Sequence, residues 1–239
     1  MKFVAATNVG KHRTNNEDCF YVDDIKKQLF ILADGMGGHL AGEEASSMVT
    51  SIISEELENL SPNVEIEDII GEIMGATQKA NHDIYEKSLK NKEYQGMGTT
   101  LSLGYLLGDV LIYTNIGDSR IYHIRDNLEQ LTKDDSFVNY LIELGEISEE
   151  EAVDHPKKNV LTKAVGTNPD ISVMINTMKV QPKDYLLFCS DGLTNMVSSD
   201  EIYEIIVNNT LEDARDCLIE KALDNGGIDN ITLILIYIE

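Results

Sequence analysis

Residues 29–39, with the sequence LFILADGMGGH, constrain this chain more than any other feature. Five apolar residues have the length of a buried strand and end at a carboxylate, Asp34. A glycine-rich turn follows, and the apolar spacing beyond it predicts a helix over residues 41–60. The glycines permit backbone angles closed to other residues, so the turn can pass close to a bound ion. The turn lacks the pattern of a dinucleotide fingerprint or a P-loop, and its leading carboxylate would repel phosphate unless a cation lay between them.

The length and composition indicate one globular domain over residues 1–239. The chain is 42% hydrophobic and 26% charged, which is typical of a folded protein with a sizeable core. Its net charge of −23 would repel a phosphate backbone, so we expect no nucleic-acid partner. The polar N-terminus and the absence of a long apolar run predict no membrane insertion. Three cysteines without a C-x-x-C pair favour a reducing, cytoplasmic location.

The pattern of the remaining segments predicts an α+β fold, because strands come in hairpin runs while helices come in pairs. Strands are expected over residues 3–8, 19–23, 99–107, 110–116, 120–124, 172–180, 185–190 and 231–238. Helices are expected over residues 66–89, 137–144, 198–208 and 210–224. The connectors 107–109 and 117–119 have the length of hairpin turns. The polar segment at about 133–166 is interpreted as a flap inserted into the domain.

Asp34 is one of four acids that lie at the ends of apolar runs. Asp118 and Asp191 each follow such a run, and Asp229 precedes the last one. Because packed sheets bring strand ends together, these charges would repel one another unless protons or cations neutralise them. No histidine or cysteine cluster has zinc spacing, and oxygen ligands suit Mg²⁺ or Mn²⁺. The pattern is therefore typical of a hydrolase that uses two metal ions.

Two further residues fit a phosphate substrate. Arg13 comes just before the acids Glu17 and Asp18, and its guanidinium group can bind phosphate oxygens in a bidentate way that lysine cannot copy. His39 follows the glycine turn and could donate a proton to a leaving oxygen. We interpret both as candidate catalytic residues.

Several motifs in a fixed order resemble one known family. They are Arg13-Thr-Asn-Asn-Glu17-Asp18, Ala33-Asp-Gly-Met-Gly-Gly-His39, Gly98-Thr-Thr100, Gly117-Asp-Ser-Arg120, Leu131-Thr-Lys-Asp-Asp135, Ser190-Asp-Gly-Leu193 and Gly227-Ile-Asp-Asn230. Together they resemble the bacterial branch of the metal-dependent PPM (type 2C) Ser/Thr protein phosphatases. The resemblance covers residues 3–238, and it implies an αββα four-layer sandwich of two antiparallel sheets flanked by helix pairs.

The resemblance also implies a metal-ligand set. Asp34 would bridge two Mn²⁺ or Mg²⁺ ions with help from the Gly35 carbonyl, and Asp191 and Asp229 would complete the first site. Glu17 and Asp18 would act on or near the second ion, partly through water. Asp118, with Asp191, would hold a weaker third ion.

The remaining implications concern the reaction. Arg13 would bind phosphate, and the flap would influence substrate choice. His39 is a less direct match, because animal members carry a histidine where Met36 stands. The implied function is hydrolysis of phosphoserine and phosphothreonine by direct attack of a metal-bridging hydroxide.

The implied partners are phosphorylated proteins, including a cognate Ser/Thr kinase and its substrates, and the chain is expected to be a monomer. Two alternatives stay open. One is a partner-switching phosphatase dedicated to a single regulatory phosphoserine. The other is a non-catalytic relative that binds phosphoproteins.

Overall fold

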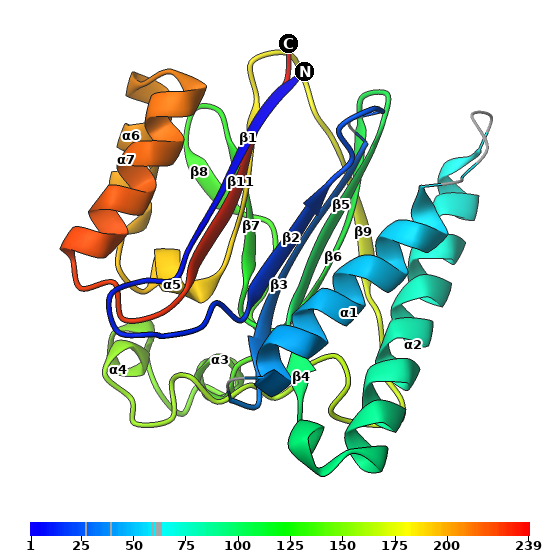
Figure 1. Cartoon of the computed structure of the whole chain (residues 1–239). Helices are drawn as coiled ribbons and strands as arrows, with labels where there is room; N and C mark the ends of the chain where they lie inside the picture. The colour runs from blue at the N-terminus through cyan, green and yellow to red at the C-terminus, as the bar shows by residue number, and fades with distance from the viewer. Residues whose placement is uncertain (27, 39, 59, 61–63) are drawn as a thin grey trace.

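Two antiparallel sheets pack face to face in the computed structural model, which describes residues 1–26, 28–38, 40–58, 60 and 64–239 (Figure 1). The first sheet has the order β1 (Lys2–Asn8), β11 (Ile231–Tyr237), β10 (Tyr185–Cys189), β7 (Arg120–Ile124) and β8 (Leu128–Gln130). The second has the order β2 (Asp18–Val22), β3 (Leu29–Met36), β5 (Leu101–Leu107), β6 (Val110–Ile116) and β9 (Ile175–Lys179), and β4 (Gly98–Thr99) pairs with β3.

Helices cover both outer faces of this sandwich. The pair α1 (Leu40–Leu57) and α2 (Ile66–Lys90) packs on the second sheet, and the pair α6 (Ser199–Asn208) and α7 (Leu211–Asp224) packs on the first (Figure 1). Within the described part of the chain, none of the helices combines the length and the apolar character that crossing a membrane requires. The predicted αββα architecture is confirmed.

The alternation of side chains along β3 explains how one strand serves two apolar layers. Leu29 and Ile31 point into the layer beneath α1 and α2, whereas Phe30 and Leu32 point into the layer between the sheets. In that middle layer the ring of Phe30 lies 6.2 Å from that of Phe188. The strand is buried on both faces, which is why its sequence reads as a continuous apolar run.

The prediction of a hairpin at residues 117–119 is wrong. β6 belongs to the second sheet and β7 to the first, so the chain crosses between the sheets at this point. Gly117 makes the crossing with a φ of +101°, and a side chain there would collide with Thr100. The other connector is a hairpin as predicted, with Leu107 opposite Val110 and Gly108 at a φ of +61°. A three-residue pattern cannot distinguish these cases, because the partner sheet decides which way the chain turns.

Several short elements were not expected from the sequence. They are β8, the 3₁₀ turn η1 (Lys92–Tyr94) and the short helix α5 (Asp191–Thr194) directly after β10. The strand expected over 172–180 is shorter and begins at Ile175.

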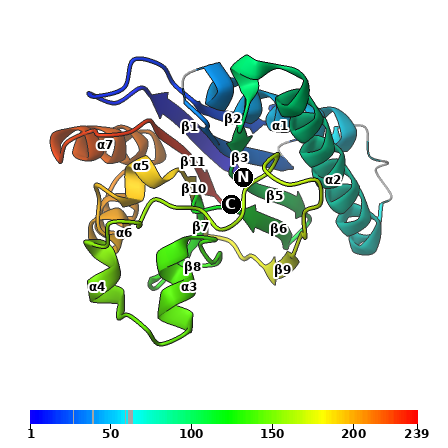
Figure 2. The same cartoon turned by 90° about the horizontal axis from the view of Figure 1, so that it is seen from below.

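The flap segment carries α3 (Phe137–Glu143) and α4 (Glu149–Val153) and lies at the lower end of the sandwich in Figure 1, the end that faces the viewer in Figure 2. Its two ends pair with each other. The Phe137 N–H donates to the Val160 carbonyl at 2.7 Å, and the Thr162 N–H donates to the Asp135 carbonyl at 2.8 Å. This pairing closes the flap into a loop whose base lies beside the ends of the sheets.

Candidate active site

The four strand-end acids meet in one cavity of about 320 Å³. Asp34 lies in β3, Asp118 follows β6, Asp191 begins α5, and Asp229 lies two residues before β11. Their carboxyl groups line the cavity together with Glu17. Asp34 and Asp229, which are 195 positions apart, therefore share one site because both sheets end at the same edge.

Asp18 joins this group from the neighbouring strand. It lies directly opposite Asp34 in the antiparallel register of β2 and β3. Its Oδ2 accepts a hydrogen bond of 2.9 Å from the hydroxyl of Ser190, which is fully buried. The Ser190 hydroxyl in turn accepts from the Thr232 N–H at 3.0 Å. The position of Asp18 is thus set by strands of both sheets.

The backbone of Asp34 is fixed by two buried threonines. Its N–H donates to the Thr100 hydroxyl at 2.9 Å, and its carbonyl accepts from the Thr100 N–H at 2.8 Å. The Thr99 hydroxyl also donates to the Asp34 carbonyl at 3.0 Å. Thr100 is further bonded to the hydroxyl of Ser119, so the segments that carry Asp34 and Asp118 are tied together.

Burial and mutual repulsion hold the pKa values of Asp18, Asp34, Asp118 and Asp191 above their usual range. Burial, and to a smaller extent the charge of Asp191, raises the pKa of Asp118 to about 7. Burial also raises the pKa of Asp18 to about 7 and that of Asp191 to about 6. For Asp34, burial and the charges of the neighbouring aspartates raise the pKa well above the ordinary value. A site of this kind favours a bound cation, because a cation relieves the same repulsion.

Two carboxylate oxygens in this group, Oδ1 of Asp18 and Oδ1 of Asp191, are buried and have no hydrogen-bond partner. Buried polar atoms are almost always paired, so these oxygens fit divalent cations that take oxygen ligands. Among the described residues, no three acidic, histidine or cysteine side chains are already placed to hold an ion as they stand. The fit therefore rests on the two unpartnered oxygens and the crowded charges around them.

Arg13 lies at the edge of the same cavity and forms an ion pair of 2.8 Å with Asp229. The loop that carries Arg13 is tied down by Asn230, whose side-chain amide donates to the carbonyls of Val9 and Asn15. The same side chain accepts from the Glu17 N–H at 2.8 Å. The structure therefore brings Arg13 and Glu17 to the acids, whereas His39 lies outside the described residues.

Comparison with known proteins identifies the family of this chain. The family model described as "Protein phosphatase 2C" matches residues 9–225. The chain belongs to the protein phosphatase 2C family. It is therefore a metal-dependent protein phosphatase that uses Mn²⁺ or Mg²⁺.

Curated relatives and solved structures of phosphatases cover nearly the whole chain. The serine/threonine phosphatase stp of Listeria monocytogenes serotype 4b is 39% identical over 234 residues, which are 96% of this chain and 93% of the relative. The structure of the Streptococcus agalactiae serine/threonine phosphatase has a TM-score of 0.94 at 36% identity. The match covers 100% of this chain and 99% of the Streptococcus agalactiae chain. The catalytic domain of the phosphatase PstP, solved with two manganese ions, has a TM-score of 0.87 at 32% identity. The match covers 100% of this chain and 98% of the PstP chain.

Sequence reasoning assigned no role to the residues that support the acids in this phosphatase. Thr100, Ser190 and Asn230 lie inside the motifs that identified the family, but only the structure shows what they bond. Asn195, which donates to Oδ2 of Asp191 at 3.0 Å, lies outside those motifs. The signal that marks three of them is burial, because Thr100, Ser190 and Asn230 are polar residues at most 4% exposed.

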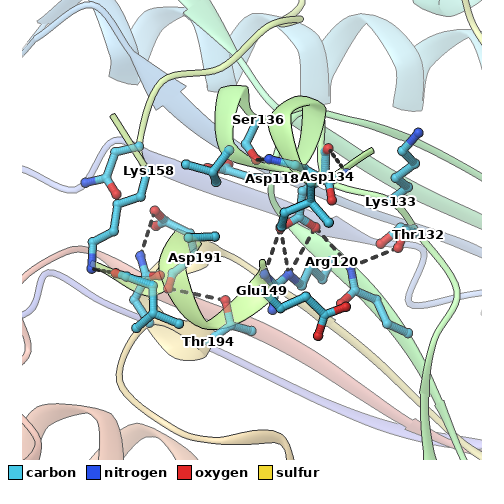
Figure 3. A pocket seen from close by; sticks show the side chains of 18 residues that line it. Asp118, Arg120, Thr132, Lys133, Asp134, Ser136, Glu149, Lys158, Asp191 and Thr194 are labelled. Atoms are coloured by element: carbon cyan, nitrogen blue, oxygen red, sulfur yellow. Dashed lines mark hydrogen bonds and ion pairs between the residues drawn. The ribbon is translucent and has the colours of Figure 1, made fainter. Parts of the chain in front are cut away.

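A second cavity of about 570 Å³ lies between the flap and the body of the phosphatase (Figure 3). It shares the lining residues Asp118, Asn159 and Asp191 with the first cavity, so the two cavities adjoin each other. At its wall Arg120 forms an ion pair of 2.7 Å with Asp134, and Figure 3 shows these two side chains pointing toward each other. The flap therefore borders the acidic site directly.

Proposed function

We propose that this phosphatase hydrolyses phosphoserine and phosphothreonine in proteins by direct attack of water on phosphorus. The observation that carries the proposal is the convergence of Asp34, Asp191 and Asp229 on one cavity that contains an unpartnered, buried carboxylate oxygen. The names of the relatives, which are serine/threonine phosphatases, support the substrate class.

The acids would hold the ions in the following way. Asp34, with the carbonyl of Gly35, would contact two ions, and Asp191 and Asp229 would complete one of the two sites. Glu17 and Asp18 would act near the other, and Asp118 would hold a weaker third ion together with Asp191. When bound, the ions would lower the pKa of a water molecule and polarise the phosphoryl oxygens.

The protein's own side chains would carry the remaining steps. Arg13 would bind phosphate oxygens at the mouth of the cavity. As the bond between phosphorus and the serine or threonine oxygen breaks, that oxygen needs a proton, and His39 is the proposed donor. The phosphoryl group is transferred to water, so no phosphorylated side chain is formed.

Turnover of a phosphothreonine peptide tests the proposal. After exhaustive chelation we expect no activity, and Mn²⁺ should restore it. Asp34→Asn should stay inactive at every Mn²⁺ concentration while remaining folded. Activity that persists after chelation would contradict the assignment. A panel of unrelated phosphopeptides separates a broad phosphatase from one dedicated to a single phosphoserine.

A comparison of two substrates tests His39. A serine or threonine alkoxide needs protonation on leaving, whereas the phenolate of p-nitrophenyl phosphate needs far less help. If His39 is the acid, His39→Ala should slow phosphopeptide hydrolysis by about 10²–10⁴-fold and the aryl phosphate much less. Equal slowing of both substrates would exclude His39 as the donor.

The proposed partners are a cognate Ser/Thr kinase and the proteins that it phosphorylates. We also propose a monomer in the cytoplasm, where a reducing environment suits Cys19, Cys189 and Cys217, which are all free thiols. Light scattering of the purified chain tests the monomer, and a doubled mass would contradict it.

A further inference from the structure

The end of β3 and the first turn of α1 approach each other at two glycines, Gly35 and Gly42. A Cβ atom on Gly35 would lie 2.7 Å from the Glu17 carbonyl oxygen and closer still to that of Gly42. A Cβ atom on Gly42 would lie nearest to Oε2 of Glu17, and it would lie 2.9 Å from both Cδ of Glu17 and the carbonyl carbon of Gly35. Neither glycine has a positive φ, so space and not backbone angle requires them. The Glu17 carboxyl group thus fills the place of a side chain on Gly42.

Glu17 has little freedom to adjust to a larger neighbour. Its N–H donates to Oδ1 of Asn230 at 2.8 Å, and its carbonyl accepts from the Gly35 N–H at 3.0 Å. The residue is only 9% exposed and lines the cavity with Asp34. Its carboxylate lies beside the first turn of α1, where the partial positive charge of the helix end favours an anion. Because these bonds hold the Glu17 backbone, a side chain at position 42 would force the Glu17 carboxylate to rotate away from its position.

We propose that Gly42 is a positioning residue for the metal pocket. Because it has no side chain, it leaves the space in which the Glu17 carboxylate lies against α1 and borders the cavity. Gly42 contacts neither ion nor substrate in this scheme and acts only through Glu17. The proposal rests on the proposed function, in which Glu17 acts near one of the ions.

The alternative is that Gly42 affects only the stability of helix α1 and has no effect on Glu17. Alanine is a better helix former than glycine, so a helix effect alone would make Gly42→Ala neutral or stabilising. Gly75 in α2 provides the matched control, because it is exposed and a Cβ atom there would have no neighbour within 4 Å. Gly75→Ala makes the same chemical change in a helix without touching the pocket.

Calorimetric titration of Mn²⁺ into the metal-free full-length chain tests the proposal. The variants are Gly42→Ala, Gly75→Ala, Glu17→Ala and the double variant Glu17→Ala/Gly42→Ala. Gly42→Ala should raise the Kd for Mn²⁺ by about 10-fold or more, as changes beside metal ligands do, while Gly75→Ala should leave it unchanged. Once Glu17 is alanine, Gly42→Ala should cause no further loss, because residues that act through each other are not additive.

Each result supports or overturns the proposal. Unchanged Mn²⁺ affinity in Gly42→Ala would overturn this inference and leave the proposed function standing. An equal loss of affinity with and without the Glu17 carboxylate would do the same. Failure of the unaltered chain to bind Mn²⁺ overturns the proposed function and this inference with it. If Gly42→Ala does not fold by circular dichroism, folding of the double variant supports the collision with Glu17. Failure of both to fold would place the collision at the Gly35 backbone and contradict the proposal.

Discussion

Nη2 of Arg13 lies 2.8 Å from Oδ2 of Asp229, although 216 positions separate the two residues. The pair joins the proposed phosphate-binding residue to a proposed metal ligand. The other oxygen of Asp229 accepts from the Asn230 N–H at 2.8 Å. Since the Arg13 side chain is 47% exposed, the ion pair contributes little to stability. Loss of this ion pair should therefore change the kinetic constants of the phosphatase and leave its free energy of unfolding nearly unchanged.

Arg13→Ala should mainly raise KM for a phosphopeptide, because the grip on phosphate exists in both the ground state and the transition state. A tenfold increase corresponds to about 1.4 kcal/mol. Arg13→Lys keeps the charge without the bidentate geometry, so its KM should lie between that of the unaltered chain and that of Arg13→Ala. Steady-state kinetics with saturating Mn²⁺ measures both variants. An unchanged KM with a collapsed kcat would show that Arg13 acts only in the transition state.

Asp118→Asn should reduce turnover while leaving two tightly bound metal ions. Asp118 lies at the crossing between the sheets and borders both cavities, so its loss should affect the proposed weaker third ion. Metal content after gel filtration and a Mn²⁺ titration of activity measure the effect. Asp109→Asn, in the exposed hairpin turn between β5 and β6, is the matched control. A single bound ion in Asp118→Asn would mean that the sites are assigned wrongly.

Ser190→Ala should destabilise the chain and weaken the metal site together. The change removes the donor to Oδ2 of Asp18 and the acceptor of the Thr232 N–H, and both Ser190 and Thr232 are fully buried. Leaving such groups unpaired costs about 1–3 kcal/mol. Urea unfolding and Mn²⁺ titration measure the two effects. Ser47→Ala, on the exposed face of α1, should change neither, and a silent Ser190→Ala would refute the role of this hydroxyl.

Asp184 lies just before β10, at the end of that strand opposite Asp191, and should govern the acid stability of the fold. Its carboxylate is fully buried and accepts from Nε of Arg125 at 2.5 Å and from the Gln181 N–H at 2.8 Å. Burial by itself would raise the pKa of Asp184, but these hydrogen bonds outweigh it and lower the pKa below the ordinary value. The ionised form therefore stabilises the folded state above the unfolded pKa, and this contribution is lost as the pH falls through the folded pKa.

Asp184→Asn should lower the free energy of unfolding at pH 7 by about 1.5–3 kcal/mol, the range for hydrogen bonds to charged groups. The difference from the unaltered chain should shrink as the pH falls below about 4, because Asp184 takes up a proton in the unfolded chain before it does so in the folded one. Urea unfolding at pH 7 and pH 3 measures it, with the exposed Asp170→Asn as a control. A difference that is equal at both pH values would contradict the ionic role, and kcat should be unaffected in either variant.

Local patterns in the sequence were enough to predict most of the fold. The continuous apolar run of β3 and the helical spacing of α1 and α2 each depend on neighbours within a few residues, so their type can be read without tertiary contacts. The strand-end positions of Asp34, Asp118, Asp191 and Asp229 are local features in the same sense. Their order within recognisable motifs also carried the family and its chemistry.

Tertiary structure decided how these pieces meet. The register of β2 and β3 places Asp18 opposite Asp34, and the crossing at Gly117 sends β7 into the other sheet. Both outcomes depend on which strands pair.

The same limit applies to the bond from Ser190 to Asp18, which joins residues 172 positions apart, and to the space that Gly42 leaves for Glu17. A local pattern does not encode contacts between such distant segments. By itself the sequence therefore determined which acids this phosphatase has and which apolar strands they adjoin. Only packing of the two sheets determined what holds Asp18 and Asp34 in place, because their partners Ser190 and Thr100 come from segments that meet these acids only in the folded chain.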